Sequence, residues 1–463
     1  MSITEALEIV SPHIGTLIGF ALAFALISRL MREKRRPSNT FAWLLIIVLV
    51  PYVGVPLYLV FGGRKIAKLT RNKSPINLKD GSDKDLQTQG TPFGILSHNN
   101  QTQFLNTGTE AFETLIKQIR QAKHSIEITT FILSHDSIGR RIVKELSDKA
   151  RAGIHVLLLL DAMGSFGKKT LYMLELEKAG GHIARFMPIF PFLSLGHANL
   201  RNHRKMAIFD RKRAIIGGRN IGRDYMGPSS NNKRWKDFGV LIEGSAVTQF
   251  NAIFKADWQF AAPKIPIIAS SQNHDTHNLE ANRSIEIMAS GPDTRGDPLY
   301  EKILLTIQEA EESVTIVTPY FIPDEVLQRT LIVKARTGKE VTLLVPLKSN
   351  HRVTDLARAY YLRELVDAGA KVRLYLPGMN HGKVLLVDDK IAMTGSANVD
   401  FRSLFVNYEI GAFFYHKSDI LAFKKWISTM MNDSGSYQEV IDKKRSFLRE
   451  IAEDISRLLT PLL

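Results

Sequence analysis

Two long apolar stretches lie near the start of the chain, and much shorter ones recur behind them. Residues 9–30 and 41–61 are almost uncharged, and each has the length of about 20 residues that crosses a bilayer as an α-helix. No Lys or Arg precedes the first stretch and a second one follows it, so the pattern is not that of a cleaved signal peptide. Residues 1–64 are therefore predicted to form a membrane anchor ahead of a large polar region.

The second apolar stretch admits two topologies. Basic clusters precede and follow it, and Pro51 and Pro56 stand on either side of Gly54. If residues 41–61 crossed fully, the two clusters would lie on opposite faces, against the tendency of positive charge to stay on the cytoplasmic side. One interpretation is a spanning helix with a kink. The other is a re-entrant segment that dips into the membrane and returns at the prolines.

The polar region contains an internal duplication. Residues 65–98 have no period and are predicted to form a linker. Helices that lead into short β-rich stretches occur in residues 99–262 and again, in the same order, in 283–435, with a second predicted linker at 263–282. This alternation predicts two similar α/β halves. Residues 436–463 are predicted to form an amphipathic helix, either docked on the core or lying on a membrane surface.

One polar pattern occurs at the same place in both halves. Residues 202–220 read NHRKMAIFDRKRAIIGGRN, and residues 380–398 read NHGKVLLVDDKIAMTGSAN. The apolar MAIF and VLLV predict buried strands. Because residues two apart on a strand share a side, each histidine shares a side with the lysine that follows it. Two copies of the string His-x-Lys-x4-Asp-x6-Gly-(Gly/Ser)-x-Asn indicate chemistry rather than a requirement of folding.

Composition narrows the classes of partner. The chain has 463 residues, 44% of them hydrophobic, and no cysteine, which excludes disulfides and thiolate metal sites. Lys and Arg number 61 against 46 acids, a formal net charge of +15. Such a surplus favours a polyanionic partner, and the apolar stretches favour an anionic membrane over nucleic acid. The sequence contains neither a P-loop nor a G-x-G-x-x-G pattern, so no motif indicates nucleotide binding.

The doubled pattern resembles the HKD motifs of the phospholipase D superfamily. More narrowly, nearly the whole chain is similar to bacterial cardiolipin synthases, including RPSNTFAWLLIIVLVPYVGVPLYLVFGGRK, TPYFIPDE and SANVDFRSLFVNYEIG. Two departures are visible. Gly382 replaces the more usual alanine between His and Lys of the second motif, and Gly218 stands where the second copy has Ser396. Neither departure removes a catalytic group.

The resemblance implies a fold and a set of site residues. The fold is α/β, with two pseudo-symmetric phospholipase D-like α-β-α halves that form one catalytic unit behind two transmembrane segments, or one transmembrane and one re-entrant segment. The implied catalytic motif residues are His203, Lys205, Asp210, His381, Lys383 and Asp388. Asn220, Asn398 and Arg201 are expected to contact substrate phosphate, with Asp237 orienting His203 and Glu409 orienting His381. Within the motifs, Asp210 and Asp388 are expected to be structural.

Phosphodiester chemistry explains why two histidines are needed. One neutral imidazole attacks phosphorus and forms a covalent phosphohistidine, while a second, protonated imidazole protonates the departing oxygen. The resemblance favours His203 as nucleophile and His381 as general acid, although the reverse assignment is open. Lysine and asparagine donors would stabilise the charge on the non-bridging oxygens. We therefore expect no metal and no other cofactor.

The implied function is that of a membrane-bound phosphatidyltransferase, which makes cardiolipin and glycerol from two phosphatidylglycerol molecules. The expected location is the inner membrane of a bacterial cell, as a multi-pass protein. Phosphatidylglycerol, cardiolipin and an anionic membrane are the expected partners, without nucleic acid, and a homo-oligomer is left open. The alternatives are a membrane-tethered hydrolytic phospholipase D or nuclease of the same superfamily, and a non-enzymatic scaffold.

Overall fold

The computed structural model describes most of the chain. The described residues are 24–25, 27–28, 37–61, 73, 88–90, 93–165, 171–187, 200–267, 283–294, 296–441 and 447–458. Two compact units are distinguished. The N-terminal unit consists mainly of residues 1–66 and 189–200, and the main unit of residues 67–188 and 201–461. The predicted apolar segment at residues 9–30 lies outside the described residues except for its positions 24–25 and 27–28.

The N-terminal unit contains two short helices that pack on each other. Helix α2 (Pro37–Leu49) and helix α3 (Pro51–Phe61) are separated at Val50. The rings of Trp43 and Tyr58 meet edge to face with centroids 5.4 Å apart. Gly54 permits close packing, because a Cβ there would lie 2.5 Å from the carbonyl oxygen of Ile46. None of the described helices is both long and apolar enough to cross a membrane.

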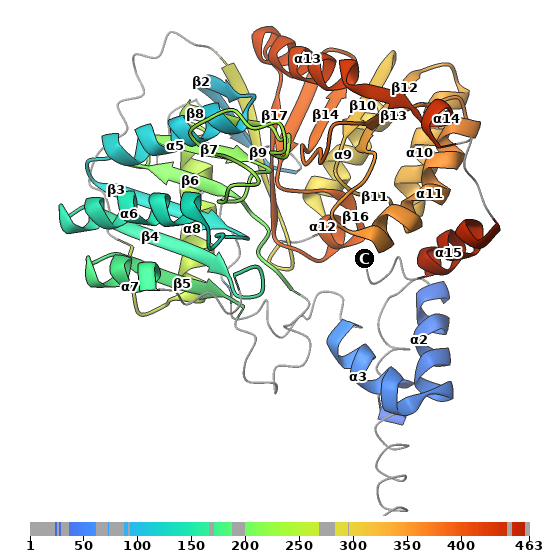
Figure 1. Cartoon of the computed structure of the whole chain (residues 1–463), viewed down its shortest axis with the longest axis horizontal. Helices are drawn as coiled ribbons and strands as arrows, with labels where there is room; N and C mark the ends of the chain where they lie inside the picture. The colour runs from blue at the N-terminus through green and yellow to red at the C-terminus, as the bar shows by residue number, and fades with distance from the viewer. Residues whose placement is uncertain are drawn as a thin grey trace, which may run out of the picture. The chain divides into compact units, whose positions relative to one another are not determined.

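One sheet runs through both halves of the main unit (Figure 1). Its strand order is β18-β13-β12-β10-β14-β15-β17-β9-β2-β8-β7-β6-β3-β4-β5, with β1 paired to β2. The first-half strands are β1 (Thr88–Gly90), β2 (Ile95–Leu105), β3 (Ser125–Thr130), β4 (His155–Asp161), β5 (His182–Phe186), β6 (Met206–Phe209), β7 (Arg213–Gly217) and β8 (Gly239–Gly244). The second-half strands are β9 (Arg283–Ser290), β10 (Ser313–Val317), β12 (Glu340–Pro346), β13 (Lys371–Tyr375), β14 (Val384–Val387), β15 (Ile391–Gly395), β17 (Glu409–Phe414) and β18 (Ser434–Ser436).

The order of the strands shows the pseudo-symmetry. Outward from the centre, β2-β8-β7-β6-β3-β4-β5 corresponds to β9-β17-β15-β14-β10-β12-β13, and the antiparallel pair β2–β9 joins the two halves. The two α/β halves predicted from the duplication are thus confirmed. Within the predicted linker at 65–98, strand β1 pairs with the first residues of β2.

Helices cover the sheet in both halves (Figure 1). In the first half they are α5 (Gly108–Gln121), α6 (Ser137–Arg151), α7 (Leu171–Lys178) and α8 (Val247–Ala261). In the second half they are α9 (Pro298–Gln308), α10 (Glu325–Arg336), α11 (Arg352–Asp367), α12 (Phe401–Phe405), α13 (Lys417–Asn432), α14 (Tyr437–Val440) and α15 (Phe447–Leu458). Asp136 and Asp324 occupy matching places, where each carboxylate accepts the first backbone N–H groups of its helix, α6 or α10.

The C-terminal part forms more than the single predicted helix. After α14 the chain continues to α15, which packs against α11, where Arg363 pairs with Glu453. This contact agrees with docking on the core. Ile451 and Ile455 remain exposed on α15, so the helix is not covered on all sides.

Candidate active site

The two histidines sit at the ends of equivalent strands next to the centre of the main unit. His203 precedes β6 and His381 precedes β14, and both strands are fully buried, as the apolar sequences predict. The backbone of each histidine is bonded to the opposite half. The N–H of His203 donates to the carbonyl of Tyr408 at 2.9 Å, and that of His381 donates to the carbonyl of Lys236 at 2.6 Å.

Each histidine ring is oriented by an acid from the opposite half. His203 Nδ1 lies 2.8 Å from Glu409 Oε1, and His381 Nδ1 lies 2.7 Å from Asp237 Oδ2. The predicted pairing, Asp237 with His203 and Glu409 with His381, is therefore wrong. The strand order explains why: β8 and β17 flank the central pair β2–β9. The backbone bonds to Tyr408 and Lys236 then place each acid, one residue further on, beside the other half's histidine.

The difference between Gly218 and Ser396 follows from the lengths of the two acids. Ser396 Oγ donates to the carboxylate of Glu409, so the longer acid has a hydroxyl partner. At Gly218 a Cβ would lie 2.6 Å from Asp237 Oδ1 and 2.8 Å from Lys383 Cδ. Asp237 lies so close to the backbone that no side chain fits at position 218. The first motif therefore has glycine where the second has serine.

Both motif lysines lie beside the histidines, as expected from strand alternation. Lys205 Nζ donates to the carbonyl of His203 at 2.8 Å. Lys383 Nζ donates to the carbonyl of His381 at 2.6 Å and lies 2.9 Å from its Nδ1. Burial, more than any other influence, lowers the pKa of Lys205 to about 7 and that of Lys383 to about 8. Each histidine therefore has a buried lysine amine beside it.

The same environment keeps the histidines neutral in the empty site. Burial, followed by the charge of Lys383, lowers the pKa of His381 to about 3. Burial also lowers the pKa of His203, and the positive charge of Lys205 adds to this effect. Although burial alone would raise it, the pKa of Glu409 falls below its usual range because its carboxylate is bonded to His203 and lies near the charge of Lys205. His203 is thus a neutral imidazole held at Nδ1 by an ionised Glu409.

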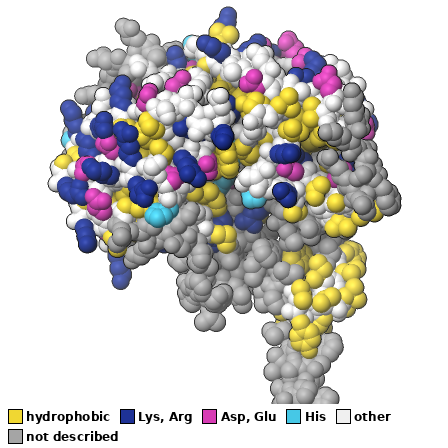
Figure 2. All heavy atoms as spheres, viewed as in Figure 1, with side chains coloured by type: hydrophobic (Ala, Val, Ile, Leu, Met, Phe, Trp, Pro, Cys, Tyr) yellow, Lys and Arg dark blue, Asp and Glu magenta, His cyan; other side chains and the backbone are white. Residues whose placement is uncertain are grey.

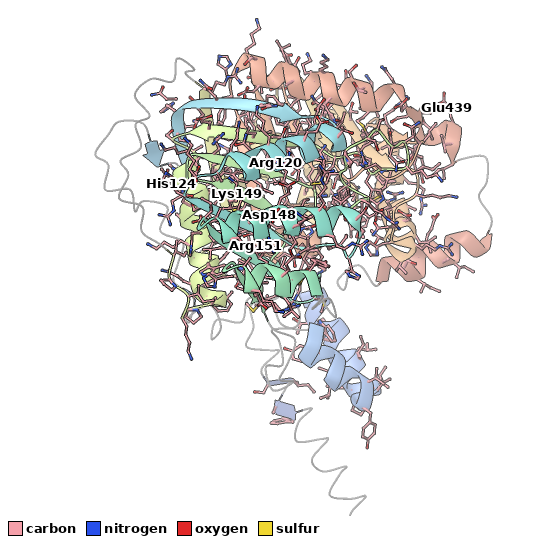
Figure 3. All side chains as sticks on the ribbon, turned by 60° about the vertical axis from the view of Figure 1, so that its left-hand side comes forward. Arg120, His124, Asp148, Lys149, Arg151 and Glu439 are labelled. Atoms are coloured by element: carbon pink, nitrogen blue, oxygen red, sulfur yellow. The ribbon has the colours of Figure 1, made fainter. Side chains whose placement is uncertain are left out.

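The two motif aspartates are structural, as expected. Asp388 accepts the backbone N–H groups of Glu311, Glu312 and Ser313 at 2.7–2.8 Å. Asp210 does the same in the first half with the backbone N–H groups of Lys123, His124 and Ser125. His124 is labelled in Figure 3 beside α6. Both aspartates have a φ of 51°, the left-handed conformation that Asp tolerates in a tight hairpin turn. They join each motif hairpin to the strand beside it.

The predicted phosphate contacts make bonds within the protein. Asn220 Oδ1 accepts the N–H of Ile132 at 3.2 Å. Asn398 Nδ2 donates to Asp400 Oδ2 at 3.0 Å. Arg201 is buried, with Nη1 3.5 Å from Asp161 Oδ1. Contact of these three residues with lipid phosphate remains a prediction.

Several residues around the histidines gave no sequence signal. The ring of Phe131 meets His203 edge to face at 5.1 Å, and Tyr225 meets His381 in the same way at 5.3 Å. These rings restrict the imidazoles and help to exclude water. Phe131 follows β3, and Tyr225 lies between β7 and β8, so both belong to connecting segments whose paths the sequence does not reveal. Among the described residues, no group of three or more His, Asp or Glu side chains is arranged to hold a metal ion.

Comparison of structures shows the class of fold. The chain is similar to phosphatidylserine synthase of Haemophilus influenzae, with a TM-score of 0.60 and 16% identity over 78% of this chain and 95% of that one. It is also similar to polyphosphate kinase of Porphyromonas gingivalis, with a TM-score of 0.50 and 11% identity over 79% of this chain and 53% of that one. With two HKD motifs at one site, this is a phospholipase D-like fold.

Comparison of sequences shows the family. A family model described as cardiolipin synthase, PLD-like domain, matches residues 115–258 and 303–431, and a phospholipase D-nuclease N-terminal model matches residues 21–63. Cardiolipin synthase 1 of Bacillus anthracis is 33% identical over 93% of this chain and 90% of its own length. The cardiolipin synthase of Listeria innocua is 32% identical over 93% of this chain and 95% of its own length. The chain belongs to the cardiolipin synthase family.

Proposed function

We propose that this protein is a membrane-bound phosphatidyltransferase that converts two phosphatidylglycerol molecules into cardiolipin and glycerol. The observation that carries the proposal is the pair of histidines, each bonded through Nδ1 to a buried acid and each next to a buried lysine. Such a site has a nucleophile, a proton donor and cations for one phosphodiester. Family membership favours transfer to a lipid over hydrolysis.

The first step forms a bond between a histidine and phosphorus. Neutral His203 Nε2 attacks the phosphorus of the first phosphatidylglycerol, and the bond from phosphorus to the glycerol headgroup breaks. Protonated His381 gives its proton to the departing oxygen. A phosphodiester anion between Lys205 and Lys383 offsets their positive charge, so its binding raises the pKa of His381 and favours the protonated acid.

The second step reverses the roles. Neutral His381 takes the proton of the terminal hydroxyl on a second phosphatidylglycerol, whose oxygen attacks the phosphatidyl-histidine. The bond from phosphorus to His203 breaks and cardiolipin is released. One phosphodiester replaces another, so the exchange needs no nucleotide. The assignment of His203 as nucleophile is supported by exposure: 12% of its side chain is accessible, against 6% for His381.

The direct test supplies purified full-length protein with phosphatidylglycerol in detergent and measures the products by mass spectrometry. Equal amounts of cardiolipin and glycerol support the proposal, whereas phosphatidic acid alone means hydrolysis. His203→Ala and His381→Ala should each lower the rate by about 10³-fold or more. His416→Ala is the control, since His416 is exposed, caps α13 and belongs to neither motif. Near-normal activity in either motif variant contradicts the shared site.

The proposed membrane attachment uses the N-terminal unit. Hydrophobic side chains cover most of the visible surface of α2 and α3 (Figure 2), and Tyr52 and Phe41 are 79% and 69% exposed. At 1.5 Å per residue the helices are about 20 Å and 16 Å long, shorter than the roughly 30 Å hydrocarbon core. Because they also pack on each other, the helices favour re-entry of residues 41–61. Residues 9–30 would form the spanning segment.

Cysteine labelling tests this topology. The chain has no cysteine, so single Ser38→Cys and Ser74→Cys variants can be labelled with a membrane-impermeant maleimide in sealed vesicles. Re-entry predicts labelling of both positions from the same side. Labelling from opposite sides would show that the second segment spans the membrane.

A further inference from the structure

A buried cluster of charges lies directly behind His203. Lys73 Nζ donates to Asp257 Oδ1 at 2.5 Å and also to Asp293, and none of these three side chains is exposed. Arg204 Nη1 donates to the same Asp257 oxygen at 2.6 Å, and Arg204 Nη2 lies 3.5 Å from Asp293 Oδ1. Two cations therefore balance two carboxylates away from water.

Lys73 joins the two halves within this cluster. Asp257 belongs to α8 of the first half, and Asp293 follows β9 of the second half. Lys73 Nζ also lies 4.6 Å from the ring centroid of Tyr408. Lys73 comes from the segment predicted to be a linker, where one lysine of a basic cluster gives no sign of burial. This residue is a fixed part of the main unit.

Two sets of hydrogen bonds connect the cluster to His203. Arg204 Nε donates to the backbone carbonyl of Glu409 at 3.1 Å, and Glu409 holds the ring of His203. Asp257 also accepts from Asn202 Nδ2 at 3.1 Å, next to His203 in the chain. Arg204 links Glu409 to Asp257, and Asn202 bonds to Asp257 directly, so both sets end on a carboxylate that Lys73 neutralises.

The second half has a different support at the matching position. Gly382 replaces Arg204 between His and Lys, and a Cβ at Gly382 would lie 2.4 Å from the ring of Trp426. The backbone next to His381 thus packs against the ring of Trp426. The residue next to His203, Arg204, instead forms an ion pair with Asp257. The charged cluster serves one histidine specifically.

We propose that Lys73 is a positioning residue for His203. By neutralising Asp257 and Asp293 together, it holds Arg204 and the Glu409 backbone where Glu409 bonds the His203 ring. Without Lys73, Arg204 alone faces two buried carboxylates, and the uncompensated negative charge pulls Arg204 toward them or draws in water. This inference rests on the proposed function, because it assumes that His203 reacts with the phosphodiester.

The test compares full-length Lys73→Met with the double variant Lys73→Met/Asp293→Asn. Methionine keeps most of the length of the side chain and removes the charge. The second change, Asp293→Asn, then leaves Arg204 and Asp257 as a neutral pair. We expect Lys73→Met to lower kcat for cardiolipin formation by about tenfold or more, with little change in KM, because a misplaced catalytic group affects the transition state. The double variant should recover most of kcat. Lys144→Met is the control, since that lysine forms an exposed pair with Asp148.

Thermal unfolding of each variant separates positioning from folding. If Lys73→Met does not fold, the double variant decides, because its cluster is neutral. A wild-type kcat in Lys73→Met overturns the inference, and so does a folded double variant whose kcat stays low. A loss of activity in proportion to unfolded protein also overturns it. If the wild type releases only phosphatidic acid, the proposed function fails, and the same comparison is then made on the rate of that release.

Discussion

Gly218 and Ser396 occupy matching positions in the two motifs, yet they are not interchangeable. Copying the second motif into the first with Gly218→Ser would place a Cβ within 3 Å of Asp237 and of Lys383. We expect Gly218→Ser to lower kcat by about 10²-fold, since displacement of the acid misorients His381. Ser396→Gly removes one hydroxyl from Glu409 and should cost less. Steady-state transfer assays check both; equal effects would contradict this account.

The lowered lysine pKa values predict how substrate binding depends on pH. Lys205 and Lys383, with pKa values of about 7 and about 8, lose their charge as the pH rises through that range, long before a solvated lysine would. The lipid phosphodiester stays ionised throughout, so its attraction to the site falls. KM for phosphatidylglycerol should therefore rise between pH 7 and pH 9. Initial rates in mixed micelles measure this, and a constant KM over that range would contradict it.

At the scale of elements, Glu409 begins β17 and Asp237 precedes β8, and each acid bonds the histidine of the opposite half. Each acid therefore has a separate task. Glu409→Gln should impair attack by His203, and Asp237→Asn should impair proton transfer by His381, because an amide stabilises imidazolium less than a carboxylate does. Each change should lower the rate by about 10²- to 10⁴-fold. Both variants should form the labelled phosphatidyl-enzyme slowly, because attack by His203 and protonation by His381 belong to the same step. Mapping the alkali-stable label in the wild type tests the assignment: label on His203 is expected, and label on His381 would reverse it.

The motif hairpins also predict an effect on stability alone. Asp388 is bound by three backbone N–H groups, which lower its pKa against the opposing effect of burial. Its contribution to stability is therefore present at neutral pH and is lost as the pH falls through its lowered pKa. Asp388→Asn should reduce the free energy of unfolding by about 1–3 kcal/mol with kcat per folded molecule unchanged. Asp389→Asn, exposed and paired with Lys424, is the control in urea titrations.

At the scale of the whole molecule, one continuous sheet joins the two halves of a single chain, and each half carries one motif. Mixing His203→Ala with His381→Ala protein should therefore restore no activity, because neither chain contains both histidines and β2 and β9 pair within the chain. The mixture is assayed after co-refolding and after simple mixing. Recovery of activity in either sample would mean that halves are exchanged between chains.

The sequence predicted the strands and the two halves of this molecule better than the side-chain contacts between the halves. MAIF and VLLV predicted buried strands, because unbroken apolar residues of that length suit a strand covered on both faces. The duplication predicted two halves and one doubled motif. The partners of Asp237 and Glu409 could not be predicted, because they depend on which strands meet at the centre of the sheet. Burial of Lys73 could not be predicted either, since the acids that receive it are distant in sequence.

The crossed acids also bear on how such a chain could have arisen. Taken alone, either half has a histidine whose orienting acid is missing and an acid that points to a histidine elsewhere. A half-length ancestor would have been active only when two copies met edge to edge. Once fused in one gene, the copies no longer had to serve two identical roles. Glycine against serine at 218 and 396, and arginine against glycine at 204 and 382, are the kind of divergence that such a fusion permits.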